Sequence, residues 1–202
     1  SGVKRPGAMA AILGDMNRPI EEVCIQASQE AGLVVTANYN CPGQLVISGE
    51  EAGVERAMAL AKEAGAKRAI RLNVSGAFHS PLMEDASSGL AQVLNEAAFD
   101  DPHFPVYANV NAEPVLKATR AKELLLEQLA SPVRWIDEIR AMGERFPQAT
   151  FVEMGPGNVL VGLVKKIVPG ARTATCGTVA EVQQLLELAA AAPVMRSASE
   201  EG

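Results

Sequence analysis

The alternation of strand and helix patterns between residues 8 and 74 most restricts what this chain can fold into. Short apolar or alternating runs indicate four strands, and two longer segments carry apolar residues at helical spacing. Glycines follow both helical segments, as expected at helix ends. We expect strands at 8–14, 33–38, 44–48 and 67–74, and helices at 20–31 and 50–64. The order β-α-β-β-α-β predicts a ferredoxin-like subdomain with two helices against one antiparallel sheet.

A different pattern follows, and we expect residues 75–191 to form part of a larger α/β domain. The predicted helices are 81–98, 120–130, 133–145, 159–168 and 179–191, and the predicted strands are 104–110, 149–154 and 172–176. Three strands are few for a parallel sheet covered on both faces, so we expect a partner segment to complete it. The small and polar tail 192–202 is expected to be disordered.

Charge and cysteine use exclude several classes of protein. The 202 residues carry a net charge of -6, and no run of Lys and Arg is longer than a pair, which argues against nucleic acid or polybasic membrane partners. No apolar run is long enough to cross a bilayer. The three cysteines form no CxxC motif, which indicates a reducing compartment and no structural zinc. We expect a cytoplasmic protein without a metal or cofactor.

One of the two histidines, His79, lies where a predicted strand ends and a helix begins. Ser80-Pro81 is typical of a helix N-cap followed by proline at the first helical position. A histidine there suits a general base, although packing at the helix start is an equally good interpretation from the residues alone. We expect Ser80 to serve as the N-cap and Cys41 to belong to a turn.

The remaining polar candidates have simpler interpretations. No Gly-x-Ser-x-Gly nucleophile motif occurs, so these residues alone do not complete an acyl-enzyme mechanism. Glu153 and Asp137 could orient an imidazole, but surface charges are the simpler interpretation. We assign no role to His103 and core packing to Trp135.

Five stretches together resemble the malonyl-CoA:acyl carrier protein transacylases of fatty acid synthesis. They are 7–14, 37–49, 76–83, 128–135 and 153–157, in family order and with family-like spacing. The resemblance implies an α/β fold in which the ferredoxin-like subdomain, here 8–74, accompanies the C-terminal part of an α/β-hydrolase-like acyltransferase domain, here 75–191.

The resemblance also implies roles for individual residues. His79 would be the catalytic base, and the main-chain carbonyl of Gln128 would accept a hydrogen bond from its other ring nitrogen. Asn38 and Asn40 match positions beside the pantetheine arm, although turn bonding is nearly as good an explanation. Phe78 would crowd an α-methyl group and so favour malonyl over methylmalonyl. The basic pair Lys67-Arg68 matches an entrance position that could meet coenzyme A phosphates or an acidic carrier protein, although a solvated helix-strand junction explains the pair equally well.

The implied reaction moves malonyl from malonyl-CoA to the pantetheine thiol of acyl carrier protein through a serine ester, for fatty acid or polyketide synthesis. The family's nucleophilic serine, oxyanion glutamine and malonyl-binding arginine precede the stretch that resembles 7–14. We therefore expect an N-terminal segment of the same enzyme to supply them, and a monomer overall. The alternative is a non-enzymatic module that binds a carrier protein or a small ligand.

Overall fold

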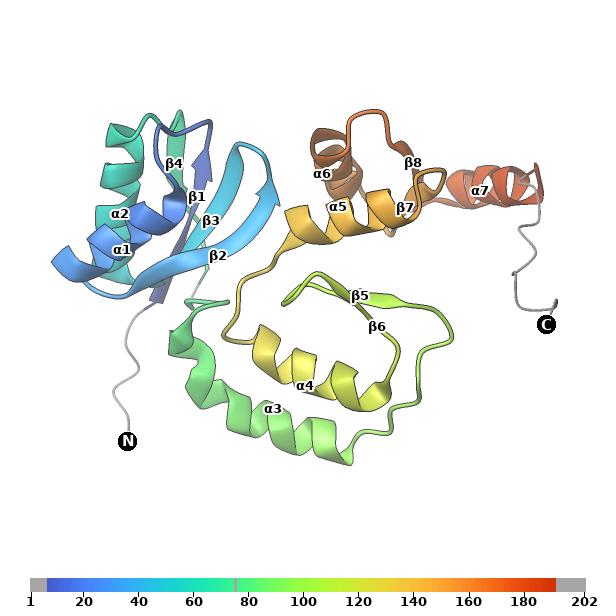
Figure 1. Ribbon diagram of the computed structural model, residues 1–202, viewed down its shortest axis with the longest axis horizontal. Helices are drawn as coiled ribbons and strands as arrows, with labels where there is room; N and C mark the ends of the chain where they lie inside the picture. The colour runs from blue at the N-terminus through green and yellow to red at the C-terminus, as the bar shows by residue number, and fades with distance from the viewer. Residues whose placement is uncertain (1–6, 75, 192–202) are drawn as a thin grey trace. The chain divides into compact units, whose positions relative to one another are not determined.

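The computed structural model describes residues 7–74 and 76–191, drawn in Figure 1. The chain divides into two compact units, of which the first ends at Arg145 and the second begins at Phe146. The domain boundary expected between residues 74 and 75 falls inside the first unit. It stays a prediction. The tail expected to be disordered, 192–202, lies outside the described residues.

The first unit begins with a four-stranded antiparallel sheet in the order β2-β3-β1-β4. Its elements are β1 (Gly7–Leu13), α1 (Ile20–Glu30), β2 (Val34–Cys41), β3 (Gln44–Glu50), α2 (Glu51–Glu63) and β4 (Arg68–Arg71). The six elements follow the β-α-β-β-α-β order predicted from the sequence. Figure 1 shows α1 and α2 on the same side of this sheet.

The two faces of the sheet have different roles because successive side chains of a strand point to opposite sides. One face packs against α1 and α2 through fully buried side chains such as Ile12, Val23, Ile47 and Val54. Each such side chain contributes about 1.5–3 kcal/mol when it leaves water. The opposite face carries a smaller apolar cluster formed by Met9, Ala37, Val46 and Leu72. The helices therefore cover one face of the sheet, and the Met9, Ala37 and Val46 side chains of the other face are buried as well.

The rest of the first unit is mainly helical. It contains a 3-10 turn (Pro81–Met83), α3 (Glu84–Glu96), β5 (Val106–Ala108), β6 (Glu113–Val115), α4 (Ala118–Gln128) and α5 (Trp135–Arg145). The predicted strand 104–110 is shorter than expected, and it pairs with β6 in an antiparallel hairpin. The sequence did not predict β6, a strand of three residues with a central proline.

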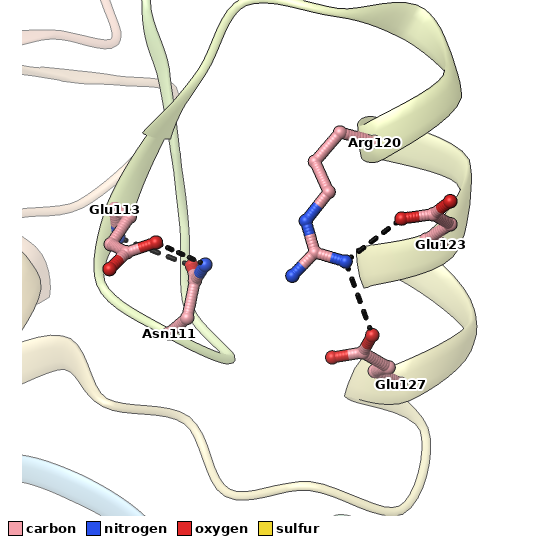
Figure 2. Close-up of polar contacts among 5 residues, drawn as sticks. All are labelled: Asn111, Glu113, Arg120, Glu123 and Glu127. Carbon is pink, nitrogen blue, oxygen red and sulfur yellow. Dashed lines mark hydrogen bonds and ion pairs between the residues drawn. The ribbon is translucent and has the colours of Figure 1, made fainter.

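Local polar contacts stabilise this hairpin and α4 (Figure 2). The Asn111 amide donates to Glu113 at 3.0 Å, and the Glu113 main-chain N–H donates back to Asn111 at 3.2 Å. Arg120 pairs with Glu123 at 2.9 Å and with Glu127 at 3.4 Å along α4. All four charged side chains are exposed, so solvent screens the two ion pairs and they add little to stability. We assign them a structural role only.

The second unit contains β7 (Thr150–Met154), α6 (Val159–Ile167), β8 (Arg172–Cys176) and α7 (Val179–Ala191). Its two strands pair in parallel. The Glu153 carboxylate accepts a hydrogen bond of 2.8 Å from the main-chain N–H of Val161, so it binds the first turn of α6. Large apolar side chains are exposed in this unit, among them Met154, Val159 and Val179. The segment expected to complete this sheet stays a prediction.

Within 7–74 and 76–191, no helix has the length and apolar character needed to cross a membrane. The same residues contain no group of three His, Cys, Asp or Glu side chains that could hold a metal ion. Cys24, Cys41 and Cys176 form no disulfide bond among these residues.

Glu138 is a buried carboxyl on α5. The residue is 6% exposed, and its Oε2 atom has no hydrogen-bond partner among the described residues. Burial raises the pKa of this carboxyl from 4.5 to about 7. The folded protein therefore binds this proton more tightly than the unfolded chain does.

This shift predicts that the stability of the first unit falls as the pH rises from about 4.5 through about 7. Above this range Glu138→Gln should be more stable than the parent by about 1–3 kcal/mol, and near pH 4.5 the two should be similar. Urea unfolding at several pH values measures both differences. Asp137→Asn, which changes the exposed neighbour, is the control that should keep the parent's pH dependence. Parallel pH profiles for the parent and Glu138→Gln would contradict this assignment.

Candidate active site

His79 occupies a strained position in the turn that follows the sheet. Its φ of 58° lies in the left-handed region, which costs a residue other than glycine about 1–3 kcal/mol. The surrounding turn is fixed by packing: a side chain on Gly7 of β1 would lie 2.6 Å from the main-chain nitrogen of Ala77. The backbone of β1 and this turn therefore touch directly, and the start of β1 needs glycine there.

The buried side chain of Ser80 stabilises the same turn. The residue precedes the helical turn as predicted, with Pro81 at the first helical position. The prediction that its hydroxyl caps the helix is wrong, because the buried hydroxyl donates to the main-chain carbonyl of Ala77 at 2.7 Å. This bond closes the turn around His79 across three residues. A left-handed residue inside a turn closed in this way is typical of a functional site.

The His79 ring is oriented by one hydrogen bond. Its Nδ1 atom lies 3.1 Å from the main-chain oxygen of Gln128. A carbonyl oxygen only accepts hydrogen bonds, so Nδ1 carries the proton, and in the neutral ring Nε2 keeps its lone pair. The contact that the family resemblance implies is thus present in the structure. The catalytic roles of the two residues stay a prediction.

The segment after Gln128 connects the histidine to the sheet. The Val133 N–H donates to the carbonyl of Ala37 at 2.8 Å, and the Tyr39 N–H donates to the carbonyl of Val133 at 2.9 Å. These bonds form a parallel bridge between Val133 and Asn38. The structure therefore brings Asn38 beside the segment that orients His79. Asn40 lies two residues farther along β2, at its hairpin end, and both asparagines are half-buried.

The basic pair lies at the other edge of the sheet. Lys67 and Arg68 are exposed, and Arg68 pairs with Leu13 at the start of β4. The strand order puts β2 and β4 three strand spacings apart, about 14 Å. The His79 turn touches Gly7, and Arg68 pairs with Leu13, at opposite ends of β1 about 20 Å apart, so only an extended ligand could contact both.

Phe78 precedes His79 and is 43% exposed. Its ring lies against Gly76, where an added Cβ would be 3.5 Å from the nearest ring atom. Phe78 is therefore the sequence neighbour of the histidine, and its side chain is exposed. Its effect on acyl selectivity stays a prediction.

A cavity of about 550 Å³ adjoins His79 between α1, the start of β2 and the turn after α4. Three titratable side chains in its wall had no signal in the sequence: Glu21, Cys24 and Tyr39. Burial raises the pKa of the Cys24 thiol to about 12, and burial followed by the hydrogen bond to Glu21 raises the pKa of the Tyr39 hydroxyl to about 12. The Tyr39 hydroxyl donates to Glu21 at 2.6 Å. No local sequence signal reports this contact, because it joins residues 18 positions apart.

Comparisons with known proteins agree on one family. The Acyl transferase domain model matches residues 2–196. The malonyl CoA-acyl carrier protein transacylase of Bacillus subtilis is 50% identical over 161 residues, which cover 80% of this chain and 50% of that protein. The transacylase of Haemophilus influenzae is 41% identical over 181 residues, which cover 90% of this chain and 57% of that protein. The chain thus spans about half the length of the curated relatives it matches.

Solved structures give the same result. An acyl carrier protein S-malonyltransferase from Vibrio cholerae matches with a TM-score of 0.84 and 40% identity, over 89% of this chain and 58% of that one. A malonyl-transacylase in complex with its type II PKS acyl-carrier protein matches with a TM-score of 0.85 and 39% identity, over 91% of this chain and 59% of that one. The family model covers almost the whole sequence. The chain therefore belongs to the acyl transferase domain family.

Proposed function

We propose that this chain supplies the base-bearing part of a malonyl-CoA:acyl carrier protein transacylase. The hydrogen bond between His79 Nδ1 and the Gln128 carbonyl carries the proposal, because it leaves Nε2 as the proton acceptor. The relatives named malonyl transacylases support malonyl as the acyl group. These similar proteins give no support to a non-enzymatic binding module.

In the proposed cycle a serine from a segment outside this chain is the nucleophile. His79 Nε2 takes the hydroxyl proton as the serine oxygen attacks the thioester carbonyl of malonyl-CoA. The departing coenzyme A thiolate then receives that proton from Nε2. In the second half, Nε2 takes the proton of the pantetheine thiol, and the thiolate attacks the serine ester. The serine oxygen leaves with the proton, so the enzyme is regenerated. Gln128 stabilises the imidazolium in both halves.

The proposed substrate contacts come from the resemblance to the transacylases, and the positions of the residues are compatible with them. Asn38 and Asn40 would bond the amides of the pantetheine arm, and Phe78 would limit the acyl group to malonyl. Lys67 and Arg68, at the far edge of the sheet, would meet coenzyme A phosphates or acidic residues of the carrier protein. The distance of about 14 Å between the sheet edges suits a long, extended arm. A cytoplasmic monomer completes the proposal, and the lack of a disulfide between the three cysteines in the described part of the chain supports a reducing compartment.

The test is transfer of malonyl from malonyl-CoA to acyl carrier protein, measured as malonyl-carrier mass. Three samples are compared: this chain alone, the chain together with the serine-bearing segment, and that segment alone. We expect transfer only in the combined sample, which we call the complete transferase. Transfer by the serine-bearing segment alone would contradict a role for His79. A malonyl adduct on this chain alone would contradict a nucleophile outside it.

A further inference from the structure

The Gln128 side chain forms a second set of contacts, separate from its main-chain carbonyl. Its Nε2 atom donates to the carbonyl of Ser131 at 3.0 Å and to the carbonyl of Pro132 at 3.4 Å. The Ser131 N–H donates back to the Gln128 carbonyl at 3.3 Å. Residues 128 and 131 are therefore bonded in both directions. The side-chain amide closes the turn that carries the carbonyl facing His79.

The chemistry of this turn matches a primary amide. The NH₂ group has two donor hydrogens, and the turn presents two carbonyl acceptors to it. A carboxylate has no donor at neutral pH and would face two carbonyl oxygens, and a thioether has no donor either. The side-chain amide of Gln128 therefore has a role of its own in this turn, in addition to the main-chain carbonyl contact to His79, which a residue of any type could make.

The turn is also fixed at its far end. Pro132 has no N–H, and the next residue, Val133, is bonded to β2 on both its N–H and its carbonyl. The Gln128 amide therefore joins the end of α4 to the segment anchored on the sheet. Because the Gln128 carbonyl is set by the same turn, loosening the turn would move the acceptor of His79 Nδ1. A shift of about 1 Å in such a contact can cost on the order of 10²-fold in rate.

We propose that the Gln128 side chain is a positioning residue, which orients His79 by holding the turn 128–132 through its amide. This inference rests on the proposed function only for its kinetic consequence. Its structural part, the ring tautomer of His79, can be measured without any activity.

The decisive variant is Gln128→Met, which keeps the main-chain carbonyl and removes both amide donors. In the complete transferase we expect kcat to fall on the order of 10²-fold while KM for malonyl-CoA changes by less than about twofold. In the 202-residue chain, ring ¹⁵N NMR should show a loss of the Nδ1–H tautomer of His79. Gln92→Met, at an exposed position of α3, is the control that should match the parent in both measurements.

A second variant, Gln128→Glu, tests the same hydrogen bonds if Gln128→Met fails to fold. Gln128→Glu lacks a donor at pH 8, and protonation at low pH restores one O–H donor to the turn. We expect its kcat, relative to the parent at the same pH, to rise as the pH falls toward 5. A flat ratio across this range would overturn the proposal. Parent-like kcat and tautomer in folded Gln128→Met would overturn it too. A parent without malonyl transfer would instead refute the proposed function, and the tautomer measurement would still test the turn.

Discussion

Replacing His79 by asparagine is expected to lower kcat of the complete transferase by about 10²–10⁴-fold, the usual contribution of a general base. Asparagine suits this position because it tolerates left-handed backbone, and His79 has φ 58°. Its amide can still donate to the Gln128 carbonyl, which His79 Nδ1 contacts at 3.1 Å. The variant therefore removes the proton acceptor and keeps both the turn and its hydrogen bond. Formation of malonyl-carrier protein from malonyl-CoA measures the loss.

His103→Asn is the matched control, because His103 is the other histidine of the chain and is exposed. We expect it to keep the parent's kcat. His79→Ala is a weaker test, because alanine at this φ adds backbone strain to the loss of the base. A His79→Asn variant that transfers malonyl at the parent's rate would remove His79 from the mechanism, whatever its position in the structure.

The small sheet could be predicted from the sequence because its signals are local. Strand alternation, helical spacing and the glycines after each helix all act within a few residues, and they gave the order of the six elements. The β5-β6 hairpin could not be predicted in full, because Glu113–Val115 is too short for a period and has a proline at its centre. Its pairing depends on the hairpin turn, where Ala112 adopts a φ of 60°.

Local sequence signals predicted only part of the candidate active site. The sequence indicates a turn at Gly76 and a helix start at Pro81, but the left-handed residue between them is His79. The contact between His79 and Gln128 joins residues 49 positions apart, so only the resemblance to known transacylases indicated it. The N-cap pattern placed Ser80 correctly, yet its hydroxyl bonds Ala77. Tertiary packing determines each of these details, and a single sequence does not report it.

Replacing either of two helical glycines by alanine is expected to change the free energy of unfolding, in opposite directions. A Cβ on Gly53 of α2 would lie 2.1 Å from the main-chain oxygen of Gly32, whereas one on Gly89 of α3 would meet nothing within 4 Å. Gly53→Ala should lower the free energy of unfolding by about 1–3 kcal/mol, because the new Cβ meets a main-chain atom that cannot rotate away. Gly89→Ala should raise the free energy of unfolding by about 1 kcal/mol, because alanine has a higher helix propensity than glycine. Urea unfolding monitored through Trp135, the single tryptophan, measures both in the first unit. Equal stability of the two variants would show that α2 does not need its close approach to the turn after α1.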